Sequence, residues 1–162
     1  LLVENGDKDQ AEILYKRALV SDPGNENITW NCTRFLMWQV NDREKARDML
    51  NDGLRAHRES GRLHLLQGEL NLLDGKATEA VESFRRARET GADQADVEYY
   101  YAFALHMSGG PIRECIAAYH VAIALKPKDG ALRLNLAQLL FVKGDDTEAS
   151  RQLQEAIRLG FR

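Results

Sequence analysis

The 162-residue sequence has little of what membrane-spanning or nucleic-acid-binding proteins need. It contains no apolar run long enough to cross a bilayer, and no basic and apolar leader at its start. Its 22 lysines and arginines are outnumbered by 25 acidic residues and are scattered among them. The formal charge of −3 leaves no excess of cations to neutralise phosphates. These features argue against direct membrane insertion and against nucleic acid as a partner.

Cysteine is almost absent, since the chain has only Cys32 and Cys115. Neither has a second cysteine or a histidine at ligand spacing, so no disulfide framework is predicted. The four histidines fall on different predicted helices without an HxxxH or HxxE pairing, so no metal site is expected. We interpret Cys115 as a small buried hydrophobic residue.

Catalytic and phosphate-binding motifs are missing as well. There is no GxGxxG, no GxxxxGK[ST] and no GxSxG in the sequence. The glycines instead occur at turns between predicted helices. The sequence therefore predicts no cofactor, no catalytic residues and no enzyme activity of its own.

What the sequence does contain is one spacing that occurs five times. A turn residue is followed five positions later by a small residue, four later by a large apolar one, and three later by another small one. The last three lie on one stripe of a helix. The last copy consists of Gly144, Ala149, Leu153 and Ala156. The first small residues of the five copies are Ala11, Ala46, Ala80, Cys115 and Ala149, at steps of 35, 34, 35 and 34 residues. Such a period indicates one supersecondary unit per repeat.

The periodicity predicts an all-α fold of nine helices, and we expect the first small residues to be equivalent and buried. Turns rich in glycine and proline, such as Asp22-Pro23-Gly24 and Gly109-Gly110-Pro111, separate the helices. Pro111 suits a first helical turn. The predicted helices cover residues 10–20, 27–40, 42–57, 61–73, 77–89, 95–107, 111–125, 131–142 and 147–159.

A 34-residue unit with these small, aromatic and proline positions resembles the tetratricopeptide repeat. Trp30 lies at the tryptophan position of the second copy, and Pro23 and Pro127 lie at the closing proline. Arg34 departs from the pattern because it occupies a small position. The resemblance covers the whole chain and implies an α-solenoid of antiparallel helix pairs, wound as a right-handed superhelix. It implies a single array, with a partial repeat over 1–25 and repeats over about 26–60, 61–94, 95–129 and 130–162.

The resemblance also implies that the first helix of each repeat lines a concave groove for a protein or peptide partner. The lining positions carry many apolar and aromatic residues, with Arg62 as their only cation. Chaperone-binding members grip a C-terminal carboxylate with a set of lysine, arginine and asparagine residues that this sequence lacks. We therefore expect an apolar segment in the groove. The competing interpretation is that the array itself covers part of this surface. The predicted partner-binding residues are Phe35, Trp38, Leu65, Leu72, Tyr99, Phe103, His106, Leu134 and Phe141.

Two classes of function remain open at this point. The array is a scaffold or adaptor, or it is a non-catalytic segment that positions substrate for a larger enzyme such as a transferase. The opening Leu1-Leu2-Val3 falls inside a helix of the repeat register, as expected for a piece of a longer array. Apolar residues at Leu1, Leu2 and the helix over 147–159 predict end-to-end self-association. The cytoplasm is the favoured compartment, with the periplasm as the alternative if a leader has been removed.

Overall fold

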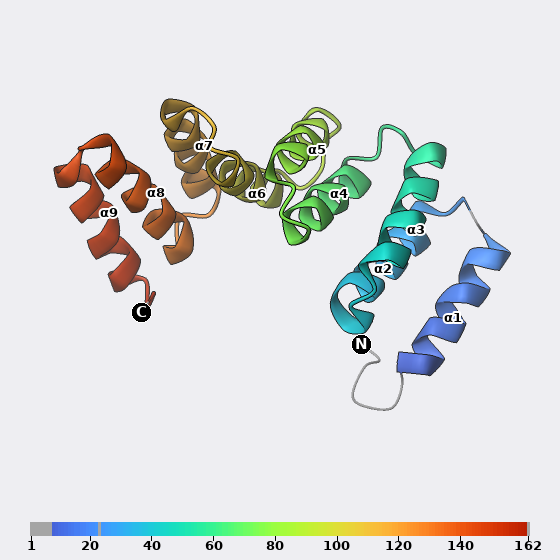
Figure 1. The fold of residues 1–162 in the computed structure, drawn as a ribbon. Helices are drawn as coiled ribbons and strands as arrows, with labels where there is room; N and C mark the ends of the chain where they lie inside the picture. Colours follow the sequence, from blue (N-terminus) through green and yellow to red (C-terminus); the bar gives the residue numbers. More distant parts are fainter. Residues whose placement is uncertain (1–7, 23, 162) are drawn as a thin grey trace.

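The computed structural model describes residues 8–22 and 24–161, without the side chains of residues 8, 9, 11, 12 and 16. This part of the chain is all-α, with no strand (Figure 1). Its elements are α1 (Lys8–Ser21), α2 (Glu26–Phe35), the π-helix η1 (Leu36–Val40), α3 (Arg43–Ala56), α4 (Gly61–Leu73), α5 (Ala77–Glu89), α6 (Gln94–Met107), α7 (Ile112–Leu125), α8 (Gly130–Lys143) and α9 (Asp146–Arg158).

Most helices of the described part begin where the sequence supplies a polar capping side chain, although α5 and α7 do not. Asp42, for example, accepts a hydrogen bond from the backbone N–H of Lys45, and Ser60 accepts one from Leu63. Such caps satisfy N–H groups that have no partner inside the helix. The capping residues with side-chain hydrogen bonds are Asn25, Asp42, Ser60, Asp93, Asp129 and Asp145. The predicted helix boundaries are therefore close to the observed ones.

Two details differ from the sequence prediction. The helix expected over 27–40 is α-helical only to Phe35 and continues as η1, which ends at Asn41 in the left-handed conformation (φ 61°). Asparagine tolerates this conformation better than most residues. Pro111 precedes α7 instead of lying in its first turn, because its ψ of 124° is extended. Its carbonyl nevertheless accepts hydrogen bonds from Glu114 and Cys115 and so starts the helix.

The helices form a row of pairs in which each element packs mainly against its neighbours in the chain. Figure 1 shows α1 and α9 at opposite ends of this row, with the pairs α2–α3, α4–α5, α6–α7 and α8–α9 following one another. The first helices α2, α4 and α6 also contact one another in turn. This arrangement is the helical solenoid expected from the repeat period.

Small side chains at the repeat positions allow the helices to approach closely. Ala46, Ala80, Cys115 and Ala149 are all at most 1% exposed, as expected, while the side chain of Ala11 lies outside the described residues. At Gly68 a Cβ atom would come within 2.3 Å of Cε1 of Phe84. The repeated stripe is therefore structural.

Candidate functional site

The first helices of the repeats present a mixed surface of exposed and buried predicted residues. Trp38 and Phe141 are exposed, at 51% and 44%. The half-buried residues of the predicted set are Leu72, Tyr99, Phe103, His106 and Leu134. None of these five belongs to the fully buried core, so each retains some accessible surface.

Phe35 and Leu65 are buried and lie inside the array. Phe35 is 6% exposed, and its ring packs against Tyr15 of α1 with ring centroids 5.1 Å apart. Leu65 is 8% exposed and belongs to a core cluster with Phe84 of α5. At these two positions the array covers its own apolar side chains, which corrects the expectation that both are open to a partner.

The C-terminal ends of the first helices expose several apolar side chains. Trp38 of η1, Met107 of α6, and Phe141 and Val142 of α8 have exposed fractions of 51%, 59%, 44% and 79%. Leu72 of α4 lies at the equivalent end of its helix and is half-buried. We call these five residues the apolar strip. The repeat register places Met107 and Val142 at lining positions as well, although neither was among the predicted partner-binding residues.

A cationic cluster lies on α2 and α4. The guanidinium carbons of Arg34 and Arg62 lie 4.4 and 4.6 Å from the centroid of the Trp30 ring. Arg62 also donates a hydrogen bond of 2.8 Å to Oδ1 of Asn27. Stacking on an indole holds a guanidinium group in place while leaving its N–H donors free. The surface of α2 and α4 therefore has two cations around Trp30, where the sequence analysis expected only Arg62.

Arg34 reaches this position because its side chain is exposed instead of facing the second helix of its repeat. Trp30 lies one helical turn before Arg34, so both side chains share one face of α2. Within the described residues, Arg34 has no hydrogen bond or ion pair. Its guanidinium group is thus available to an anionic group of a ligand.

Glu69 of α4 lies near the cationic cluster in a partly desolvated position. Burial raises its pKa to about 7, and the nearby charge of Asp96 adds to the rise while Arg34 opposes it. Asp96 itself pairs with Nζ of Lys126 at 2.5 Å. Glu69 therefore changes charge close to neutral pH, beside Arg34.

The aromatic residues of α6 continue this surface. Tyr100 stacks on Phe84 with ring centroids 5.6 Å apart and packs edge-on against Tyr99. Burial, with a smaller contribution from Glu69, raises the pKa of Tyr100 to about 12. Burial lowers the pKa of His106. The aromatic rings of α6 near Phe103 are thus neutral at pH 7.

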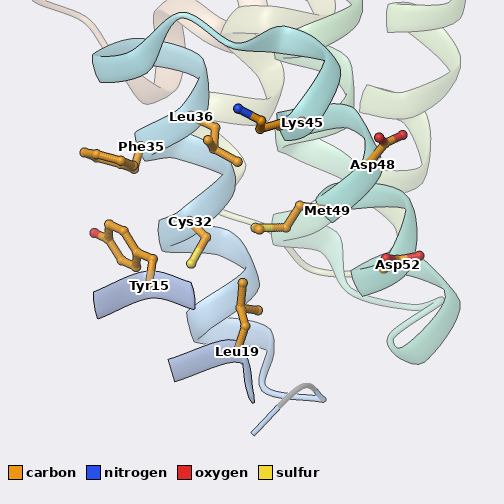
Figure 2. A pocket seen from close by; sticks show the side chains of 9 residues that line it. All are labelled: Tyr15, Leu19, Cys32, Phe35, Leu36, Lys45, Asp48, Met49 and Asp52. Carbon is orange, nitrogen blue, oxygen red and sulfur yellow. The ribbon is translucent and has the colours of Figure 1, made fainter. Parts of the chain in front are cut away.

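A separate apolar cavity of about 270 Å³ lies between α1, α2 and α3 (Figure 2). Tyr15 and Leu19 of α1 line it together with Cys32 and Met49. Burial raises the pKa of the Cys32 thiol to about 11. Lys45, Asp48 and Asp52 of α3 also line the cavity, which lies between α1 and the next repeat.

Other kinds of site find little support in residues 8–22 and 24–161. No group of three or more histidine, cysteine or acidic side chains in this part of the chain could hold a metal ion. None of the described helices has the length and apolar character to span a bilayer.

The fold is that of a helical-repeat protein. Residues 2–70 match the family model of the tetratricopeptide repeat. This part of the chain is therefore similar to tetratricopeptide repeats, a family whose repeats serve as protein-interaction scaffolds.

Solved structures of MamA share this fold. One covers 99% of this chain and 96% of its own, with 20% identity and a TM-score of 0.81. A second has 22% identity and a TM-score of 0.81, over 95% of this chain and 83% of its own. MamA from Desulfovibrio magneticus RS-1, from residue 41 to its end, has 15% identity and a TM-score of 0.83 over 96% of this chain and 86% of its own. A sequence search of curated proteins finds no match.

Proposed function

We propose that this array binds an apolar segment of a partner protein along its first helices, as a scaffold or adaptor. The observation that carries the proposal is the apolar strip, whose members occupy equivalent helix ends in four consecutive repeats. Exposed apolar surface of this kind marks interaction sites. A segment laid across the strip would bury side chains that water now contacts. Phe103, half-buried on α6, extends this surface toward the aromatic residues of the same helix.

The cationic cluster favours a partner segment that carries an acidic residue. Arg34 lies on α2, which continues as η1 with Trp38 of the strip, and Arg62 lies on α4, which carries Leu72. An acidic side chain in the partner segment would accept hydrogen bonds from these guanidinium groups. The favoured partner therefore combines apolar anchors with an acidic residue at the α2–α4 end.

Truncation of Phe103 and Trp38 tests the groove. The full-length protein is used to capture partners, and the bound segment is then synthesised and titrated against purified variants. Aromatic anchors at an interface commonly cost about 2 kcal/mol or more when truncated, or roughly thirtyfold in affinity. We expect Phe103→Ala and Trp38→Ala each to weaken binding by this amount and to leave the melting temperature nearly unchanged.

Ile157→Ala serves as the matched control, because Ile157 is an exposed apolar residue of α9 outside the groove. It should leave the affinity unchanged. A segment that binds both aromatic variants as tightly as the natural protein would contradict the groove proposal. If Phe103→Ala leaves binding intact but lowers the melting temperature by many degrees, Phe103 is a core residue.

The same groove would serve the alternative function, in which the array positions a substrate protein for a catalytic domain. No feature of the described residues favours that alternative. The sequence of any residues that flank these 162 would decide between the scaffold function and the substrate-positioning function.

A further inference from the structure

Glu69 of α4 is a half-buried carboxylate without a direct partner. Within the described residues it makes no hydrogen bond and no ion pair. Its oxygens retain accessible surface, in contrast to Oε2 of Glu98, which is fully buried without a partner. A carboxylate that has lost part of its water and gained no partner is destabilised in its charged form. Glu69 is therefore an accessible group whose charge the chain itself does not compensate.

Two charged residues on neighbouring first helices act on Glu69. Arg34 of α2 attracts its charge, and Asp96 of α6 repels it. Tyr100 of α6 lies close enough for the charge of Glu69 to raise its pKa. Among the described residues, no charge of α3 or α5, the other helices packed against α4, adds to these effects on Glu69. Arg34 lies on the Trp30 ring and does not offset the burial, because the pKa of Glu69 remains raised to about 7. A further cation beside Glu69 would stabilise its charged form.

The neighbouring carboxylate shows how the chain binds such a cation. Asp96 pairs with Nζ of Lys126 at 2.5 Å, and the same ammonium group lies 5.6 Å from the centroid of the Tyr99 ring. A carboxylate and an aromatic ring of α6 thus hold one lysine together. Glu69 lies beside the next tyrosine, Tyr100, but no cation of the described chain lies within ion-pair distance of it.

We propose that Glu69 binds a lysine or arginine side chain of the partner segment. The inference rests on the proposed function, in which a segment lies along the first helices. It adds a basic residue to the acidic residue that Arg34 and Arg62 favour. Leu72 of the apolar strip follows Glu69 by about one helical turn, so both share one face of α4. A basic residue of the partner would pair with Glu69 while a neighbouring apolar residue contacts Leu72. Complementary charges of this kind fix the identity and register of a partner.

The first experiment selects binding segments from a library of random dodecapeptides displayed on phage. The library is panned at pH 8 on the whole chain, on Glu69→Gln and on Trp38→Ala. We expect the natural chain to enrich peptides in which lysine or arginine stands beside apolar residues. Glu69→Gln should still select apolar peptides, but without the excess of basic residues.

The same selection separates this inference from the proposed function. Peptides that need Trp38 but show no excess of lysine and arginine would overturn the role of Glu69 and leave the groove proposal intact. Peptides that bind Trp38→Ala as tightly as the natural chain would instead contradict the groove proposal itself.

The pH dependence of a selected, fluorescently labelled peptide tests the pairing directly. Lysine and arginine stay charged near neutral pH, and only the ionised Glu69 pairs with them. Because the pKa of Glu69 is about 7 in the free chain, its ionised fraction rises about tenfold from pH 6 to pH 8. We expect the affinity to rise by about tenfold over the same range. Glu69→Gln should remove this rise, and so should glutamine in place of the basic residue of the peptide.

Glu89→Gln is the matched control, because it removes the same charge from an exposed glutamate of the second helix α5. It should keep both the affinity and its rise with pH. Equal losses of affinity in Glu89→Gln and Glu69→Gln would show that net charge attracts the peptide, and an affinity of the natural chain that does not change with pH would contradict the pairing. Urea denaturation of Glu69→Gln shows whether the variant is folded, and its neutral side chain should leave it at least as stable as the natural chain at pH 8.

Discussion

At the scale of single residues, Gly68 shows how tightly the repeats are packed. A Cβ atom there would lie 2.3 Å from a ring atom of Phe84, which is fully buried and stacked on Tyr100. The ring therefore has no room to move away. Overpacking costs about 1–3 kcal/mol, whereas alanine gains up to about 1 kcal/mol over glycine inside a helix. We expect Gly68→Ala to reduce the free energy of unfolding by about 1–2 kcal/mol in urea denaturation.

Gly24→Ala is the matched control for this measurement. No other heavy atom lies within 4 Å of a Cβ built at Gly24. The change should alter stability by no more than about 0.5 kcal/mol. Equal effects of the two substitutions would mean that the contact with Phe84 does not limit packing.

Glu69 is the second residue that leads to a testable prediction, which concerns the pH dependence of stability. Its pKa rises from 4.5 to about 7 in the folded chain, so folding is favoured while the carboxyl group is protonated. This contribution to stability is fully present below about pH 4.5 and is lost as the pH rises through about 7. Glu69→Gln stays neutral at every pH. The variant should therefore gain stability relative to the natural protein between pH 5 and pH 8, as measured by urea denaturation.

A carbon NMR titration of the Glu69 carboxyl group provides the direct check, with an expected midpoint near 7. Parallel stability curves for the two proteins across this range would show that Glu69 titrates in its ordinary range. The effect also bears on the groove. Above the midpoint, the carboxylate of Glu69 would oppose an acidic partner residue near Arg34.

At the scale of elements, the packing of α1 against α2 and α3 can be measured by chemical modification of a thiol. Cys32 of α2 is 1% exposed and lines the cavity that Tyr15 and Leu19 of α1 help to close. The high pKa of its thiol leaves little thiolate to react. In a Cys115→Ala background we expect slow modification by a thiol reagent in the folded protein. Leu19→Ala should accelerate it severalfold, because the loss of this contact frees α1 from α2 and α3.

Ile13→Ala is the control on the same helix, since Ile13 is 51% exposed. Its rate of modification should match that of the parent. If both substitutions accelerate the reaction alike, Cys32 becomes accessible by opening of the whole array and not by release of α1.

The elements themselves were largely predictable from the sequence. Caps such as Asp42 and Asp145, and the 34-residue stripe, act over a few residues, so local pattern determines where each helix begins and ends. The continuation of α2 as η1 was not predicted, because no pattern in residues 36–40 distinguishes a π-turn from an α-turn. The position of Arg34 over Trp30 and the burial of Phe35 depend on how neighbouring helices pack. The charges that act on Glu69 come from Arg34 on α2 and Asp96 on α6, and no local spacing predicts that these side chains lie close together.

At the scale of the whole molecule, the last helix raises the question of self-association. Ile157 of α9 is 61% exposed, while Leu153 and Leu159 are half-buried; Leu1 and Leu2 lie outside the described residues. In a solenoid such a face would cover the next repeat. We expect the average mass in sedimentation equilibrium to increase with protein concentration, and Ile157→Asp to abolish the increase. A monomer at every concentration would contradict this prediction.

The two tryptophans of the chain, Trp30 and Trp38, both lie on the continuous helix formed by α2 and η1. One is covered by two guanidinium groups, and the other is half open to water in the apolar strip. Intrinsic fluorescence excited at the indole band therefore comes entirely from the second repeat. Desolvation of Trp38 by a bound segment would shift its emission to shorter wavelength, and an anion that draws Arg34 away would change the quenching of Trp30. The protein thus carries its own optical reporter for the groove, and Trp38→Phe and Trp30→Phe would separate the two signals.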